Sequence, residues 1–241
     1  MFINYAKQYS DMPFVIMLDE DENGYKAGRF LRASDLGMSG ENNEWEPVIQ
    51  DKLSQQLLVP NGTMGQRWEE GKKWNLKLET EDGTPIDPML SMVESDYHVE
   101  TIQFPYFDSS GDGIFERPIA TRTIQLANGE EVKIATVYDL MTSQYGVQRF
   151  EHELEATSYD DASSKYTPAW QEQITGIKKE LVTKVAKEFA QNAIDTGGRS
   201  MIIMGAGINH WFNSDTIYRS ILNLVLLCGC QGVNGGGWAH Y

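Results

Sequence analysis

The sequence predicts a mixed α/β fold, in which a Rossmann-like α/β segment carries a β-rich insertion. Three observations lead to this prediction. Residues 121–140 alternate apolar and polar side chains on both sides of an Asn128-Gly129 pair, which is typical of a β-hairpin. Residues 174–193 carry apolar side chains at helical spacing. Residues 201–204 form an unbroken apolar run, typical of a buried strand, and a Gly-x-Gly turn follows them.

The first part of the chain, residues 1–136, is expected to be β-rich with hairpins. Residues 13–31 contain two strand-like runs around a polar turn at 19–24, which predicts a hairpin. We also expect strands within 57–68 and 73–79, where Asn-Gly and Pro mark the turns. These patterns indicate which neighbouring segments pair, but they do not indicate how the strands assemble into a sheet.

The second part, residues 137–241, is expected to contain a helix, a buried strand, a glycine loop, a second helix and a second glycine loop. We expect the first helix to begin after an N-cap at Thr175 and to end at Gly197-Gly198. We expect the strand at 201–204 to be buried on both faces and the second helix to span 214–227. The first helix carries an apolar stripe that consists of Ile177, Leu181, Val182, Val185, Ala186 and Phe189.

The first glycine loop is a candidate ligand site. Gly205, Ala206 and Gly207 directly follow the predicted strand, and α/β proteins bind ligands beyond the carboxyl ends of their strands. Glycine permits a positive φ and lets a ligand approach the backbone, while the N–H groups that follow favour an anion such as a phosphate. The third glycine of the dinucleotide-binding fingerprint is absent. A tight strand-to-helix turn is therefore the alternative interpretation.

Polar and aromatic residues follow this loop at once. Asn209 and His210 stand where hydrogen bonds to a ligand would come from. The alternative is that His210 is a satisfied loop histidine and that Trp211 belongs to the core. Carboxylates are scattered along the chain and no Ser/His/Asp arrangement presents itself, so no catalytic residue is assigned.

Charge and cysteine content exclude several classes of partner. The formal net charge is −15, from 35 acidic and 20 basic residues, which argues against nucleic acid as a ligand. The longest apolar run, 221–230, is too short to span a bilayer, and the N-terminal residues lack a signal-peptide core.

Cys228 and Cys230 lie too close for a usual disulfide, so we expect a reducing, cytoplasmic setting. A Cys-x-Cys pair could bind zinc or iron, but the apolar helix before it favours buried, inert thiols and no metal ligand is assigned.

Several stretches, in order, resemble a known family. They are "YAKQYSDMPFVIMLDE", "GRFLRASDLG", "LLVPNGTMGQRW", "TVYDLMTSQYGV", "SYDDASSKYTPAWQEQITGI" and "GRSMIIMGAGINHWFNSDTIYRSILNLVLLCGCQGVNGGGWAHY". Together they resemble the catalytic α subunits of membrane-bound respiratory nitrate reductases, which are molybdopterin oxidoreductases of the dimethyl-sulfoxide-reductase type. The "NHW" and "CGC…GGGWAHY" elements are the most specific to the nitrate reductase branch. The resemblance extends over essentially the whole chain.

The resemblance implies an activity and a set of cofactors and partners. The subunit would reduce nitrate to nitrite in anaerobic respiration, at molybdenum held by two pyranopterin guanine dinucleotides. A 4Fe-4S cluster would be ligated outside this chain, and electrons would come from an iron–sulfur β subunit and a haem-bearing membrane subunit. The complex would be cytoplasmic and held at the membrane by its partners. Because the family subunit is several times longer, we expect this chain to be an internal fragment that is inactive alone.

The resemblance also assigns binding residues. They form the turn after the strand, the polar contacts beside it and a second glycine-rich loop on the same side. These cofactor-binding residues are Gly205, Ala206, Gly207, Asn209, His210, Gly235, Gly236, Gly237, Trp238 and His240. Nitrite oxidoreductases and other oxyanion oxidoreductases share much of this region, and a stand-alone, non-catalytic ligand-binding module is a further alternative.

Overall fold

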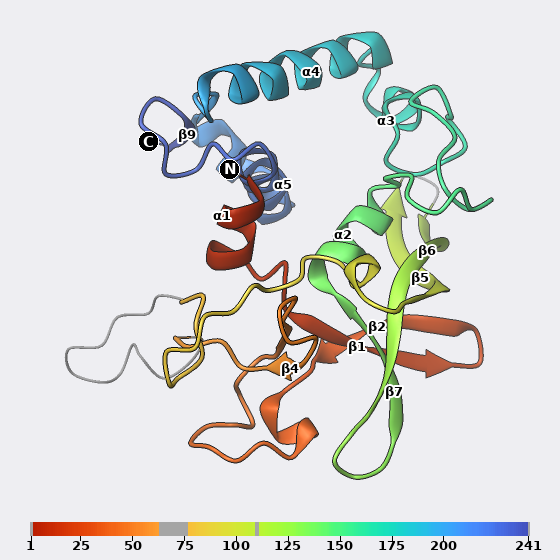
Figure 1. The fold of residues 1–241 in the computed structure, drawn as a ribbon. Helices are drawn as coiled ribbons and strands as arrows, with labels where there is room; N and C mark the ends of the chain where they lie inside the picture. Colours follow the sequence, from red (N-terminus) through yellow and green to blue (C-terminus); the bar gives the residue numbers. More distant parts are fainter. Residues whose placement is uncertain (1, 63–76, 109–110, 241) are drawn as a thin grey trace.

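The fold consists of a closed β barrel followed by a helical region with a small parallel sheet (Figure 1). The computed structural model describes residues 2–62, 77–108 and 111–240. Strands and helices both contribute, which confirms the mixed α/β class. The barrel lies within residues 15–136, and most of the helices follow it. The division of the chain into parts 1–136 and 137–241 stays a prediction.

Five strands close the barrel in the order β1-β2-β5-β6-β7. Two of its hairpins follow the local sequence pattern. The β1–β2 hairpin is confirmed, although β1 continues three residues past the predicted strand end before it turns at Glu22-Asn23. The β6–β7 hairpin is also confirmed, and its turn places Gly129 at φ +87°. The strands are β1 Val15–Asp21, β2 Gly24–Phe30, β5 His98–Asp108, β6 Gly111–Gln125 and β7 Glu131–Thr136.

Closure of the barrel depends on pairings between distant parts of the chain. Strand β1 pairs with β7 in antiparallel fashion, with Val15 opposite Thr136. Strand β2 pairs with β5 in parallel, with Tyr25 opposite Ile102. Apolar side chains from several strands fill the barrel interior. Its fully buried members include Val15, Leu31, Ile102, Ile119 and Ile134.

Shorter elements surround the barrel. They are the helix α1 Phe2–Tyr9, the 3-10 turns η1 Ala33–Leu36 and η2 Met92–Glu94, and the strands β3 Ile49–Gln50 and β4 Leu57–Leu58. Of the strands expected within 57–68 and 73–79, the described residues form only β4 and a single bridge between Glu79 and Pro85. Residues 63–76 lie outside the described part of the chain.

The helices after the barrel are α2 Val137–Gln144, α3 Pro168–Thr175, α4 Lys179–Thr196 and α5 Ser214–Leu227. The predicted span of α5 is confirmed. The predicted N-cap of α4 is wrong, because Thr175 is the last residue of α3 and α4 begins at Lys179. Gly176 causes the difference, since it adopts the left-handed conformation at φ +72° and ends α3. The predicted end of α4 is confirmed, with Gly197 at φ +67°.

Burial of the α/β part differs from the prediction. The strand β8, Met201–Met204, forms as expected, but Met201 and Ile203 are 45% and 77% exposed. In the described chain, β8 pairs only with β9, Gly237–His240, in a sheet of two strands. Successive side chains of a strand point to opposite faces, so Ile202 packs with Val225 and Cys230 while Met201 and Ile203 share the other face, which is open. The apolar stripe of α4 is also open to solvent, with Leu181 and Val185 more than half exposed. Figure 1 shows α4 running between α3 and the region of β9.

No helix in the described ranges combines the length and the apolar character needed to cross a bilayer.

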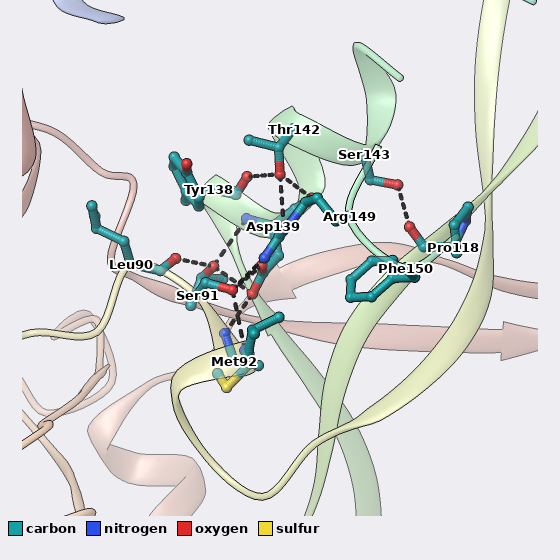
Figure 2. A network of polar contacts seen from close by, with 12 residues as sticks. Leu90, Ser91, Met92, Pro118, Tyr138, Asp139, Thr142, Ser143, Arg149 and Phe150 are labelled. Carbon is teal, nitrogen blue, oxygen red and sulfur yellow. Dashed lines mark hydrogen bonds and ion pairs between the residues drawn. The ribbon is translucent and has the colours of Figure 1, made fainter. Parts of the chain in front are cut away.

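A buried ion pair joins the barrel to the helices that follow it (Figure 2). Asp139 in α2 is fully buried, and its Oδ1 lies 2.7 Å from Nη1 of Arg149. The same carboxylate accepts hydrogen bonds from Ser91 Oγ at 2.6 Å and from the backbone N–H of Met92 at 2.7 Å. Thr136, the last residue of β7, caps α2 by accepting from the N–H of Asp139. The network thus fixes η2, β7, α2 and the segment around Arg149 to one another.

We expect Asp139→Asn to lower the free energy of unfolding by about 3 kcal/mol, because it leaves the Arg149 guanidinium without its counter-charge. Denaturant unfolding measures the loss. The matched control is Glu188→Gln, which removes one charge from an exposed pair with Lys184. Equal unfolding midpoints for the two variants would contradict the structural role of Asp139.

Candidate functional site

The parallel pairing of β8 and β9 defines one edge of the small sheet. Met201 lies opposite Gly237 and Met204 lies opposite His240. Helix α5 connects the two strands, so the unit has the β-α-β order of an α/β fold. The carboxyl ends of both strands therefore meet at the same edge. The first loop leaves β8 there, and β9 ends there at His240.

The first loop is a tight 3-10 turn, η3, over Ala206–His210. Neither of its glycines uses the positive φ that glycine permits. Gly205 has φ −98° and ψ 169°, an extended conformation open to any residue, and Gly207 lies within the 3-10 turn without a positive φ. Gly207 is exposed, and a Cβ added to it would meet no atom within 4 Å. The fold therefore does not explain why residue 207 is a glycine.

The second loop requires its three glycines for structural reasons. Gly235 and Gly237 have φ +87° and +93°, a conformation that side chains with a Cβ rarely adopt. A Cβ on Gly236 would lie 2.1 Å from the carbonyl oxygen of Gly198 and 3.0 Å from that of Cys230. Close backbone packing thus accounts for this glycine run before any ligand is considered.

Tyr218 brings the first loop and the end of β9 together. The second glycine loop lies at the opposite edge of the sheet, because Gly237 pairs with Met201 at the start of β8, so the expectation that both loops lie on the same side is wrong. Its hydroxyl donates a hydrogen bond to Oδ1 of Asn209 in η3 and lies 2.8 Å from Nε2 of His240 in β9. Its ring centroid lies 5.4 Å from those of both Trp238 and His240. Our sequence reasoning did not identify Tyr218. It is the fifth residue of α5, so a signal was present: an aromatic hydroxyl near the start of the helix that follows the first glycine loop.

Trp238 and His210 occupy contrasting positions. The Nε1–H of Trp238 is buried and has no hydrogen-bond partner in the described structure. The side chain of His210 is exposed, and among the described residues it makes no hydrogen bond and no ring contact. Trp211 is 69% exposed, so its alternative assignment to the core is wrong for this chain. The structure therefore brings Asn209, Trp238 and His240 together through Tyr218 and leaves His210 beside them without a contact.

The two cysteines lie at the end of α5. Cys230 is buried and Cys228 is half-buried, and both are free thiols. Burial raises the pKa of the Cys228 thiol, and the neighbouring Cys230 raises it further. Within residues 2–62, 77–108 and 111–240, no three His, Cys, Asp or Glu side chains gather in a group that could hold a metal ion.

We predict opposite effects on stability when a glycine in each of the two loops is replaced by alanine. We expect Gly236→Ala to destabilise the fold by about 3 kcal/mol, since its Cβ would overlap backbone atoms. We expect Gly207→Ala to leave the unfolding midpoint unchanged, because space is open around residue 207. Thermal unfolding of both variants checks this. A stable Gly236→Ala protein would contradict the packing of the second loop.

Comparison with known proteins assigns the family. The family model of molybdopterin oxidoreductases matches residues 55–241. The chain is 55% identical over 241 residues to the nitrate reductase alpha chain of Bacillus subtilis (strain 168). It is 42% identical over 254 residues to the respiratory nitrate reductase 1 alpha chain of Escherichia coli (strain K12), and 42% identical over 248 residues to the nitrate reductase alpha subunit of Mycobacterium tuberculosis (strain ATCC 25618 / H37Rv).

Each match covers the whole of this chain and 20% of the relative. The chain therefore spans about a fifth of the length of the curated relatives it matches. The similarity extends through the barrel as well as through the two glycine loops. On these matches, the chain belongs to the molybdopterin oxidoreductase family.

Proposed function

We propose that this chain is part of the catalytic subunit of a nitrate reductase and contributes to the binding site of a molybdenum bis(pyranopterin guanine dinucleotide) cofactor. One observation carries the proposal: in a chain of this family, the β8–β9 pairing sets the first glycine loop and His240, the last residue of β9, at one edge of a parallel sheet. That edge is where α/β folds bind nucleotides. The reaction would be the reduction of nitrate to nitrite and water with two electrons and two protons.

The groups at this edge fit a polar, nucleotide-bearing cofactor. Asn209 and His240 are exposed and offer hydrogen-bonding atoms. Gly207 leaves open space at the backbone, so a ligand atom can approach it. The buried Nε1–H of Trp238 is an unpaired donor next to the same cluster. An unpaired buried donor costs about 1–3 kcal/mol, which a ligand acceptor would offset.

In this proposal the residues of the chain bind and orient, and they perform no chemical step. The cofactor, when bound, supplies the two-electron redox chemistry at molybdenum. Gly205, Ala206, Gly207, Asn209 and His210 form the first contact region. Gly235, Gly236, Gly237, Trp238 and His240 form the second, which leads into β9 and runs along it to the edge where the first region lies. Residues 1–136 would support this α/β part from one side.

The proposal also includes partners and location. Electrons would arrive from an iron–sulfur β subunit and a haem-bearing membrane subunit, through a 4Fe-4S cluster ligated outside this chain. The complex would lie on the cytoplasmic side of the membrane. The support for these statements is the similarity to respiratory nitrate reductase alpha chains alone.

The first test is the composition and activity of the full-length subunit. We expect the full-length subunit to hold two pterins per molybdenum and to reduce nitrate with a reduced viologen dye, because the cofactor site is complete only in the full-length subunit. The isolated 241-residue chain should show no turnover above buffer. Metal analysis, pterin fluorescence and a nitrite assay measure these quantities. A full-length subunit without molybdenum, or sustained turnover by the isolated chain, would contradict the proposal.

The second test is His210→Ala in the full-length subunit. The His210 side chain makes no hydrogen bond among the described residues, so we expect an unchanged unfolding midpoint. We expect cofactor content or turnover to fall roughly ten- to a hundredfold, from the loss of a buried polar contact to the ligand. His98→Ala is the matched control, because His98 is an exposed histidine at the first position of β5. If both variants keep the cofactor content and specific activity of the wild type, His210 does not contact the cofactor.

A further inference from the structure

Three elements meet at the hydroxyl group of Tyr218. The tyrosine comes from α5, Asn209 comes from η3, and His240 is the last residue of β9. The residues are 9 and 22 positions away from Tyr218 in the sequence. Sequence proximity alone therefore does not bring Asn209 and His240 together, and the tyrosine hydroxyl is the atom they share.

The proton count at this hydroxyl fixes the direction of both hydrogen bonds. A phenol carries one proton, and Tyr218 donates it to Oδ1 of Asn209. At the 2.8 Å contact with His240, the phenol oxygen must then accept, so Nε2 of His240 carries a hydrogen. In the neutral imidazole, Nδ1 is consequently a hydrogen-bond acceptor.

The same logic orients the amide of Asn209. Because Oδ1 receives the tyrosine proton, the amide Nδ2 group points its donors elsewhere. No described residue accepts a hydrogen bond from Asn209 Nδ2 or donates one to His240 Nδ1. Both side chains are exposed. The loop edge therefore presents one donor and one acceptor whose directions are set by Tyr218.

Ring packing holds the tyrosine in place. Tyr218 and Trp238 are half-buried, and their rings are tilted by 40° at 5.4 Å. The rings of Trp238 and His240 contact each other edge-on, at 5.8 Å. Such aromatic contacts add stability beyond the area that they bury. The Tyr218 hydroxyl is thus fixed by packing that does not involve the hydroxyl itself.

We propose that Tyr218 is a positioning residue, whose hydroxyl holds the Asn209 amide and the His240 imidazole in the orientations that bind an acceptor and a donor on the cofactor. The proposal rests on the proposed function, because the ligand is the molybdopterin cofactor named there. Tyr218 itself does not touch the cofactor. Its effect is to remove the cost of orienting two polar side chains when the ligand binds.

The test compares two tyrosine-to-phenylalanine variants of the full-length subunit. Tyr218→Phe keeps the ring and removes only the hydroxyl. The matched control is Tyr145→Phe, which removes a hydroxyl that accepts a hydrogen bond from Asn223 of α5 at 3.1 Å, away from the loop edge. Molybdenum and pterin content per mole of subunit is the first measurement. The second is the rate at which diethyl pyrocarbonate modifies His240 in cofactor-free subunit, located by mass spectrometry with His98 as internal reference.

We expect Tyr218→Phe to lower cofactor content about three- to tenfold, and to raise the modification rate of His240 by a similar factor, since one hydrogen bond is lost in each case. Tyr145→Phe should match the wild type in both measurements. The role of Tyr218 is overturned if Tyr218→Phe retains as much cofactor as the wild type, whether or not His240 becomes more reactive. A wild-type subunit without molybdenum or pterin contradicts the proposed function instead.

A second variant keeps the proposal testable if Tyr218→Phe loses stability. Asn209→Asp preserves the acceptor for the tyrosine proton and removes the amide donor. We expect it to lower cofactor content while the modification rate of His240 stays at the wild-type value. Unchanged cofactor content in Asn209→Asp would overturn the proposal that the Asn209 amide donates a hydrogen bond to the cofactor.

Discussion

The buried carboxylate of Asp139 is the constraint on which the arrangement of this chain depends. A charge without access to water is tolerated only where a counter-charge and hydrogen bonds replace its hydration. Arg149 supplies the charge, and Ser91 and the N–H of Met92 supply hydrogen bonds. These partners come from segments about 47 and 10 residues away. Satisfying one carboxylate therefore fixes where the barrel ends and where the helices begin.

The same region connects the barrel to the candidate site. Helix α2, which carries Asp139, ends beside Tyr145, whose hydroxyl accepts a hydrogen bond from Asn223 of α5. Tyr138 and Met141 of α2 pack in an apolar cluster with Leu226 and Leu227 of α5 and with Ala6 of α1. Helix α5 is thereby held from the barrel side along its second half. Its first half carries Tyr218 to the loop edge.

Different physical reasons explain the glycines at the candidate site. Gly236 is required because the backbone of Gly198 leaves no room for a Cβ, and this holds with or without a ligand. Gly207 has a conformation that other residues adopt and open space around it. Only the second kind is informative about ligand approach. The sequence alone does not show which glycines are required by packing and which leave room for a ligand, because Gly198, the neighbour of Gly236, is 38 positions away in the chain.

The sequence by itself determined the locally coded features. The β6–β7 hairpin, the span of α5 and the end of α4 at Gly197 follow from periodicity and turn chemistry within a few residues, and the motifs pointed to the correct family. Only the tertiary structure decided the closure of the barrel, the contacts of Tyr218 and the exposure of β8 and α4. Strand pairing and burial depend on which distant surfaces meet, and an apolar stripe predicts a buried face without indicating what covers it. For that reason Ile203 is 77% exposed in a run that looks fully buried.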